Sequence, residues 1–249
     1  MKRRDETASA GFARLSARAT AGAWRLEDAI DWSLPVAPAR HWPRGLHVRL
    51  VSQLRHGEEA TAAICRHLID ALEGDEARRC LAVQESDERR HAAAYGAYVR
   101  RLGQDAPANP LLDALFQRAA AWKGHPLAMV LAFHIVIEGE ALKLQKALAA
   151  SSPCPLFRAI NARIANDEAR HVAFGVRYAR AALPDIDAED RAVIAAWLKS
   201  LWFEAARITT CHFGALSWLA GIGHVSHDRM WRRRAERLAR LGLNETMAA

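Results

Sequence analysis

Apolar residues recur at helical spacing along almost the whole chain. Positions i, i+3, i+4 and i+7 are repeatedly apolar between the proline and glycine breaks, whereas alternating, strand-like stretches are scarce. The pattern predicts an all-α protein. We expect long helices over residues 44–73, 75–102, about 126–151 and about 156–183, a short helix within the connection at 104–126, a fifth long helix capped by Asp187 that fades at 221–223, and a sixth in the C-terminal tail.

Glycine, proline and polar capping residues predict where several of these helices begin and end. Gly74 closes the first long helix, and Asp75 is a natural N-cap for the second, which should end before Gly103. Asn109 followed by Pro110 is typical of an N-cap and a first helical position.

The order of these elements predicts one domain over residues 1–249. Two long helices, a long crossover and two more long helices are expected of a four-helix bundle, here at 44–183. Residues 1–43 should form an N-terminal arm laid over the bundle, and 184–249 should add C-terminal helices with an arginine-rich tail.

A short polar motif is written twice on the predicted helices. Asp-Glu-x-Arg-His occurs at 87–91 and again at 167–171, a shift of 80 residues. Glu58 and Glu138 lie 30 residues before the glutamates of these two motifs. The turn of each helix pair lies about midway along that spacing, and an α-helix rises about 1.5 Å per residue. Glu58 and Glu138 should therefore lie at about the same height in the bundle as the motif glutamates of their helix pairs. Within each Glu-x-x-His, the two side chains share a helix face.

Folding the two halves together brings four carboxylates and two imidazoles into one bundle. Such a cluster of charges in a dry core would cost several kcal/mol per ion or more unless it is neutralised, and two divalent cations supply the four positive charges required. One Glu from each of two helices with Glu-x-x-His from the other two is the composition of di-iron and di-manganese carboxylate sites, and oxygen-rich ligation suits iron or manganese. The expected ligands are Glu58, Glu88, His91, Glu138, Glu168 and His171.

These residues resemble the ferritin-like di-iron carboxylate superfamily, especially its oxidase and oxygenase branch near the ribonucleotide reductase small subunit. The resemblance covers about residues 44–183 and implies that Glu58, Glu88 and His91 hold one half of the site, with their counterparts holding the other. It also implies that Asp167 orients His91, and that Asp87 orients His171 in the same way.

Several neighbours of the motif leave alternatives open. Glu59 and Glu140 could replace Glu58 and Glu138, but they do not keep the common spacing and are expected in solvent or behind the ligands. We expect Arg90 and Arg170 to form ion pairs behind the ligands.

Two further residues are candidates for the chemistry. His134 lies one turn before Glu138 and is an extra ligand, a pocket residue or a hydrogen-bonded core histidine. The resemblance places Tyr95 where the reductase subunit carries a radical tyrosine, although packing beside the site is the simpler role. Some N-oxygenating relatives use an additional histidine where this chain has Ile164, which counts against assigning their chemistry here.

Other side chains are expected to be structural. Cys65, Cys80, Cys154 and Cys211 have no zinc or disulfide spacing and are interpreted as buried hydrophobes. The aromatic residues of the fifth helix are expected in the core or an interface, or in the wall of an apolar tunnel; they are Trp197, Trp202, Phe203, Phe213 and Trp218.

The net charge of +7 is concentrated near the C-terminus. Residues 228–240 hold six arginines and two acids, more than half of the excess, so the charge is interpreted as a solvated tail and not a groove, with nucleic-acid contact as the alternative. The chain has no apolar run of membrane-spanning length and no signal-peptide core, so a cytoplasmic location is the expectation.

The resemblance implies an enzyme that activates dioxygen or peroxide at a dinuclear centre and oxidises a small organic molecule. Fe/Fe, Mn/Fe and Mn/Mn pairs remain open, as do hydroxylation, N-oxygenation, desaturation and self-oxidation. An electron donor and a homodimer are expected. The alternatives are a ferroxidase without an organic substrate, a hydroxylase that modifies RNA, and a bundle whose metals are structural.

Overall fold

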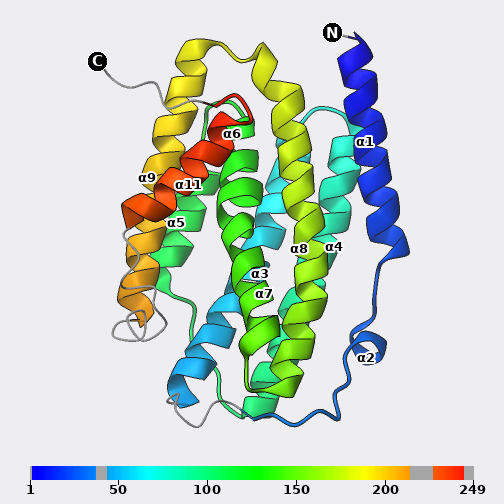
Figure 1. The fold of residues 1–249 in the computed structure, drawn as a ribbon, viewed down its shortest axis with the longest axis vertical. Coiled ribbons are helices and arrows are strands. Elements are labelled where there is room, and N and C mark those ends of the chain that lie inside the picture. The colour runs from blue at the N-terminus through cyan, green and yellow to red at the C-terminus, as the bar shows by residue number, and fades with distance from the viewer. Residues whose placement is uncertain (1, 38–43, 214–226, 244–249) are drawn as a thin grey trace.

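A computed structural model describes residues 2–37, 44–213 and 227–243, and no strand occurs among them. The bundle contains two antiparallel helix pairs, which confirms the prediction of an all-α, ferritin-like four-helix bundle (Figure 1). The first pair is α3 (Arg44–Ala71) with α4 (Asp75–Leu102), and the second is α7 (Glu138–Ser151) with α8 (Pro155–Ala182). The crossover between the pairs carries α5 (Pro110–Ala120).

Most predicted helix ends are confirmed. Gly103 ends α4 in the left-handed conformation with φ 68°, and the Asn109 side chain accepts a hydrogen bond from the Leu111 amide at the start of α5. The predicted cap of α4 was wrong by one residue: Gly74, with φ 90°, is the N-cap, and Asp75 is already helical. A backbone with positive φ favours glycine at this boundary.

The third long helix is not uniform. It consists of α6 (Leu127–Val130), a π-helical segment η1 (Leu131–Ile137) and α7. The Glu138 amide donates to the carbonyl of Phe133, five residues earlier, so the helix is widened where it delivers Glu138 to the bundle interior. Periodicity predicted the helix but not this π segment, which is the kind of feature often found at functional sites.

The N-terminal arm is largely helical. α1 (Lys2–Ala21) packs along α4 and α8, and the short α2 (Leu26–Ala29) follows it (Figure 1). The arm was predicted to lie over the bundle, but its long helix was not predicted.

The C-terminal part packs beside the crossover and the third helix. It comprises η2 (Leu183–Asp185), α9 (Ala188–Phe213) and α11 (His227–Ala239). Asp187 caps α9 as predicted, because its carboxylate accepts from the Asp190 amide at 2.8 Å. Trp202 is buried against Trp231, which confirms core packing for that part of the aromatic set. Trp218 and residues 221–223 lie outside the described part of the chain.

The structure also tests the predictions about the cysteines and about membrane-spanning helices. Cys65, Cys80 and Cys154 are buried, but Cys211 is exposed on the outer side of α9, so the prediction of four buried cysteines was wrong for that residue. None of the helices in the described ranges is long and apolar enough to cross a membrane.

Candidate metal centre

Six buried side chains from four helical segments converge in the middle of the bundle. Each is at most 7% exposed. Glu58 comes from α3, and Glu138 begins α7 directly after the π segment. The remaining four come from the two motifs on α4 and α8: Glu88, His91, Glu168 and His171.

Glu88 and Glu168 each reach both imidazoles. The two oxygens of Glu88 lie 3.5 Å from His91 Nδ1 and 3.1 Å from His171 Nδ1. The oxygens of Glu168 lie 3.4 Å and 3.3 Å from the same two nitrogens. Each of these carboxylates therefore offers one oxygen to either half of the cluster, which is the arrangement of a bridging ligand.

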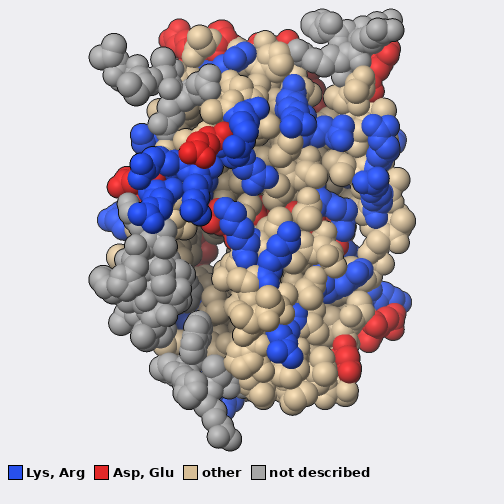
Figure 2. Space-filling model, in the orientation of Figure 1, with Lys and Arg blue, Asp and Glu red and all other residues tan. Residues whose placement is uncertain are grey.

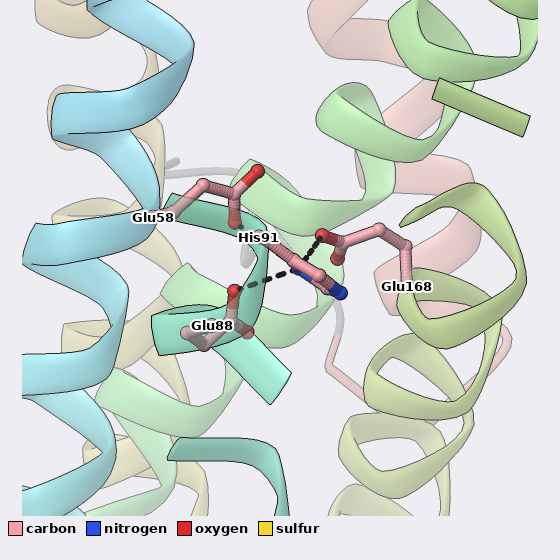
Figure 3. Close-up of side chains that lie close together, drawn as sticks. All are labelled: Glu58, Glu88, His91 and Glu168. Carbon is pink, nitrogen blue, oxygen red and sulfur yellow. Dashed lines mark ion pairs between the residues drawn. The ribbon is translucent and has the colours of Figure 1, made fainter. Parts of the chain in front are cut away.

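Glu58 and Glu138 each belong to one half. Ligand atoms of Glu58, Glu88, His91 and Glu168 lie within 4.8 Å of one another, and so do those of Glu88, Glu138, Glu168 and His171. Figure 3 shows Glu58, Glu88 and Glu168 approaching His91 from three different helices. The resemblance assigned one motif glutamate to each half; in the structure both lie within 3.5 Å of both imidazoles.

Each imidazole is held from behind by a carboxylate of the opposite motif. His91 Nε2 lies 3.2 Å from Asp167, and His171 Nε2 lies 3.2 Å from Asp87. These contacts leave Nδ1 of each ring facing the glutamates, where a metal ligand needs its lone pair.

The two arginines of the motifs pair with these aspartates. Arg170 contacts Asp167 at 2.7 Å and Asp87 at 3.2 Å, and Arg90 pairs with Asp87 and lies 3.9 Å from Asp167. Two positive charges thus balance two negative charges behind the imidazoles, and the four glutamates remain to be neutralised.

Proton affinities in the cluster reflect this uncompensated charge. Burial, reinforced by neighbouring carboxylates, raises the pKa of Glu58 and Glu138 well above the usual range. Burial alone would lower the pKa of His91 and His171, but the surrounding carboxylates outweigh it and raise both well above normal.

Several buried polar atoms of the cluster have no hydrogen-bond partner within the part of the chain that the structure describes. They include His91 Nδ1, Glu88 Oε2 and Glu138 Oε2. Unpartnered donor atoms that face one another across a few ångströms fit two divalent cations, which would use these lone pairs and supply the missing positive charge. The oxygen-rich set with one imidazole for each ion suits iron or manganese.

The neighbouring glutamates face away from this cluster. Glu59 is paired with Arg55 and His56 on the exposed side of α3. Glu140 pairs with Lys143 and with Arg234 of α11. The structure therefore brings Glu58 and Glu138 into the cluster, in agreement with the spacing in the sequence.

A family model described as p-aminobenzoate N-oxygenase AurF matches residues 58–214, which span 157 of the 249 residues and all six candidate ligands. The chain belongs to the AurF family. A search of curated proteins finds no match. This is a family of ferritin-like di-iron oxygenases, so membership confirms the branch that the motifs indicated and favours oxygenase activity on an organic substrate.

The AurF family match bears directly on Ile164. The resemblance gives N-oxygenating relatives an extra histidine at this place, one turn before Glu168, but Ile164 is fully buried and apolar. The equivalent position in the first half is Gln84, which is polar. Because the family model matches across this position, the departure at Ile164 does not remove the chain from the family.

Gln84 connects His134 to the cluster and was missed in the sequence. Its amide nitrogen donates to Glu138 at 2.6 Å and to Glu88 at 3.0 Å, and its oxygen lies 3.0 Å from His134 Nε2. His134 is fully buried and reaches the cluster through this amide. The signal was present, since Gln84 precedes Glu88 by one helical turn on the same face.

Tyr95 lies beside the cluster without a hydrogen bond to a candidate ligand. Its hydroxyl donates to Asn161 at 3.0 Å, and burial raises its pKa well above the usual value. Gln145, a second missed residue, donates over 3.3 Å to Glu58 and 3.4 Å to Glu168. It follows Glu138 by seven residues, two turns along the same face, which is the signal that could have found it.

Trp24 of the arm also contacts the centre's supporting residues. Its indole N–H donates to Asp167 at 2.7 Å. The guanidinium groups of Arg90 and Arg163 lie 5.2 Å and 5.3 Å from its ring centroid. No motif around Trp24 signals this contact, because it depends on how residues 22–25 leave α1.

A small cavity touches the centre beneath α1. It has a volume of about 20 Å³ and is lined by Gln84, Asp87, His171 and Phe174 from the bundle and by Ser16 from the arm, among others. This is room for about one water molecule.

Proposed function

We propose that the chain is a dinuclear, iron-dependent oxygenase that oxidises a small organic molecule with dioxygen. The observation that carries the proposal is the pair of buried carboxylates, Glu88 and Glu168, which each reach both imidazoles. Membership of the AurF family supports the reaction class. Amine N-oxygenation is the first reaction to test, because the family description names it.

The six ligands would hold the two ions, with Glu58 and His91 on one, Glu138 and His171 on the other, and Glu88 and Glu168 shared. When bound, two iron ions close together supply the pair of electrons that reduction of dioxygen requires. Asp87 and Asp167 hold the imidazole Nε2 protons, so that Nδ1 stays available.

The surrounding residues keep the site dry. Phe174 is 3% exposed and lines the small cavity beside His171, which α1 covers, and Ile164, one turn before Glu168 on α8, is fully buried. Exclusion of water protects reactive species from side reactions and strengthens electrostatic interactions within the site. Gln84 restrains Glu138 through its 2.6 Å hydrogen bond.

The first test is the metal content of the chain after expression with iron and manganese both available. About two ions per chain are expected in the wild type. The metal content should fall sharply in Glu168→Ala, which removes one of the two carboxylates proposed to be shared between the halves. The reduced protein should then consume dioxygen and convert p-aminobenzoate or another aromatic amine. A well-folded protein that is loaded with two irons but consumes no dioxygen would exclude the proposed activity.

A ferroxidase is the second candidate, and the size of the cavity favours it. A volume of about 20 Å³ beside the centre has no room for an organic molecule while α1 is in place. Stepwise addition of Fe(II) in air separates the two functions. A ferroxidase continues to oxidise iron well beyond two ions per chain, whereas an oxygenase without substrate stops near the capacity of its site.

A further inference from the structure

A groove of about 520 Å³ lies on the outer face of α8, between α1 and α11. Its floor is small and apolar, with Ala169 and Val172, and its rim carries Arg177, Arg180 and Arg237. Arg237 belongs to the arginine-rich tail, which was interpreted as a solvated tail and not a groove, so one arginine of that segment lines a groove. α11 folds back over the bundle (Figure 1). Its Arg237 lines the groove together with the arginines of α8.

The groove is positively charged and uncompensated. No acidic side chain is among its lining residues, and within the described ranges none of its three guanidinium groups has an ion-pair partner. Arg177 packs against α1, since a Cβ at Gly11 would lie 2.0 Å from its Nη1. Its Nε is buried without a hydrogen-bond partner. Figure 2 shows Lys and Arg side chains gathered over the same face, where α11, α8 and α1 lie.

The groove lies directly behind the candidate metal centre. Ala169 and Val172 on its floor immediately follow Glu168 and His171 on α8. The same helical turns therefore present ligands to the interior and the groove to solvent. An α-helix with its side chains is about 10–12 Å across, so an occupant of the groove is separated from the ligands by roughly one helix.

We propose that this groove is the docking site of a small acidic redox protein of the ferredoxin or flavodoxin class, which delivers electrons through α8. The inference rests on the proposed oxygenase function. One oxygenation uses the substrate, dioxygen, two electrons and two protons, and releases the oxidised substrate and one water. Two donor molecules each give up one electron, and the protons come from solvent.

The shape and chemistry of the groove favour a protein over other anions. Sites for small molecules bury most of their ligand, whereas Ala169, Ala173 and Arg180 are exposed. Single-stranded nucleic acid stacks on aromatic side chains, and none lines this groove. Arginines around an apolar floor suit the acidic rim and apolar centre of a protein partner.

The test compares two double variants with equal changes in charge. The groove variant, Arg180→Glu with Arg237→Glu, reverses the charge of the groove. The control variant, Arg158→Glu with Lys146→Glu, makes the same change in charge at exposed positions outside the groove. Binding of an oxidised acidic [2Fe–2S] ferredoxin and of a flavodoxin is measured by calorimetry at low and high salt. At least one of the two redox proteins should bind the wild type in a salt-sensitive manner. Its affinity for the groove variant should be lower by about tenfold or more, and its affinity for the control should be nearly that for the wild type.

Electron delivery is then measured with the metal-loaded proteins. The rate of dioxygen consumption with the reduced partner, divided by the rate with dithionite, should fall in the groove variant and not in the control. A metal-loaded wild type that consumes no dioxygen with dithionite would contradict the proposed oxygenase function. Charge-specific binding of a redox protein would then still support the docking site. Absence of binding by both redox proteins overturns the docking proposal, as does equal loss in the control. Binding of tRNA at these arginines without binding of either redox protein also overturns it.

Discussion

At the scale of single residues, the two halves of the candidate centre share their ligand types but differ in the side chains that touch them. Gln84 donates to Glu138 and Glu88, whereas its counterpart at the 80-residue shift is the apolar Ile164. Gln145 contacts Glu58 over longer distances, and its counterpart is Cys65. The two halves of the candidate centre are therefore inequivalent, and we expect them to bind metal with different affinities.

The aspartate behind each imidazole provides the first prediction. Asp167→Asn keeps the size of the side chain but removes the charge that accepts from His91 Nε2. Metal affinity in the half that contains His91 should fall about 10- to 100-fold. Titration of the metal-free protein with Fe(II) under anaerobic conditions measures this change, with one binding step weakened and the other retained.

Asp87→Asn is the matched variant on the other side. It removes the corresponding acceptor of His171 and should weaken the other binding step. If both variants weakened the same step, or neither weakened any, the aspartates would not act through their separate imidazoles. Thermal unfolding of each metal-free variant shows whether loss of the Arg170 contacts, rather than loss of metal, explains the result.

His134 gives a prediction about pH. Burial is the main cause that lowers its pKa to about 3, so below the ordinary value near 6.5 the unfolded chain binds a proton that the folded chain does not. The free energy of unfolding should therefore fall as pH decreases from about 6.5 towards 3, by about 2 kcal/mol at pH 5 from this group.

Comparison with His134→Gln isolates that contribution. Urea unfolding of both metal-free proteins at pH 7.5 and pH 5 should show the wild type losing about 2 kcal/mol more than the variant. Parallel losses in the two proteins would mean that His134 is not kept neutral by its surroundings.

At the scale of secondary-structure elements, the π segment packs directly on a glycine in the facing helix. A Cβ on Gly175 would lie 2.5 Å from the Cβ of His134. Gly175 is the counterpart of Tyr95 at the 80-residue shift, so one half fills this place with an aromatic ring and the other with the widened helix. Gly175→Ala should lower the free energy of unfolding by about 1–3 kcal/mol through overpacking. Urea unfolding of the metal-free protein measures the loss.

Gly96→Ala is the control for the backbone effect of the substitution. Gly96 also lies within a long helix, but a Cβ there would meet nothing closer than 3.6 Å, and only flexible arginine side chains at that distance. Alanine in a helix interior is favoured over glycine by about 0.5–1 kcal/mol, so this variant should be as stable as the wild type or more so. Equal destabilisation of both variants would remove the special role of Gly175.

The sequence predicted the bundle helices and the convergence of six side chains because both follow from local rules. Helical periodicity and the glycine and asparagine boundaries locate α3, α4, α5 and α8 almost to the residue. The repeated spacing favours Glu58 over Glu59, and the structure places Glu58 inside and Glu59 outside. That these residues bind metal stays a prediction.

The features that were missed depend on packing between distant segments. The helical form of α1 is weakly amphipathic in sequence and acquires its role by lying on α4 and α8. The contact between Trp24 and Asp167 joins residues 143 positions apart. The π segment packs closely on the small Gly175 of another helix. None of these has a signature within one element, so periodicity and capping do not reveal them.

At the scale of the whole molecule, binding of metal should determine how stable the bundle is. Four buried glutamates from four helical segments repel one another unless protons or cations neutralise them. Ions bound only by the folded state add a free energy of RT ln(1 + [L]/Kd), which is about 4 kcal/mol when the free metal is 1,000 times the dissociation constant. We therefore predict that a chelator lowers the free energy of unfolding of the loaded protein by several kcal/mol.

Anaerobic urea unfolding with Fe(II) and with excess chelator measures this difference. Glu168→Gln keeps the shape of the side chain but removes a charge shared by both halves, so the difference between the two conditions should fall to less than half of its wild-type value. Arg158→Gln, an exposed neutral-for-charged substitution elsewhere on α8, should retain the full difference. A wild type whose unfolding is the same with iron and with chelator would show that metal does not hold the four helices together. The carboxylate cluster would then have to be stabilised by shared protons.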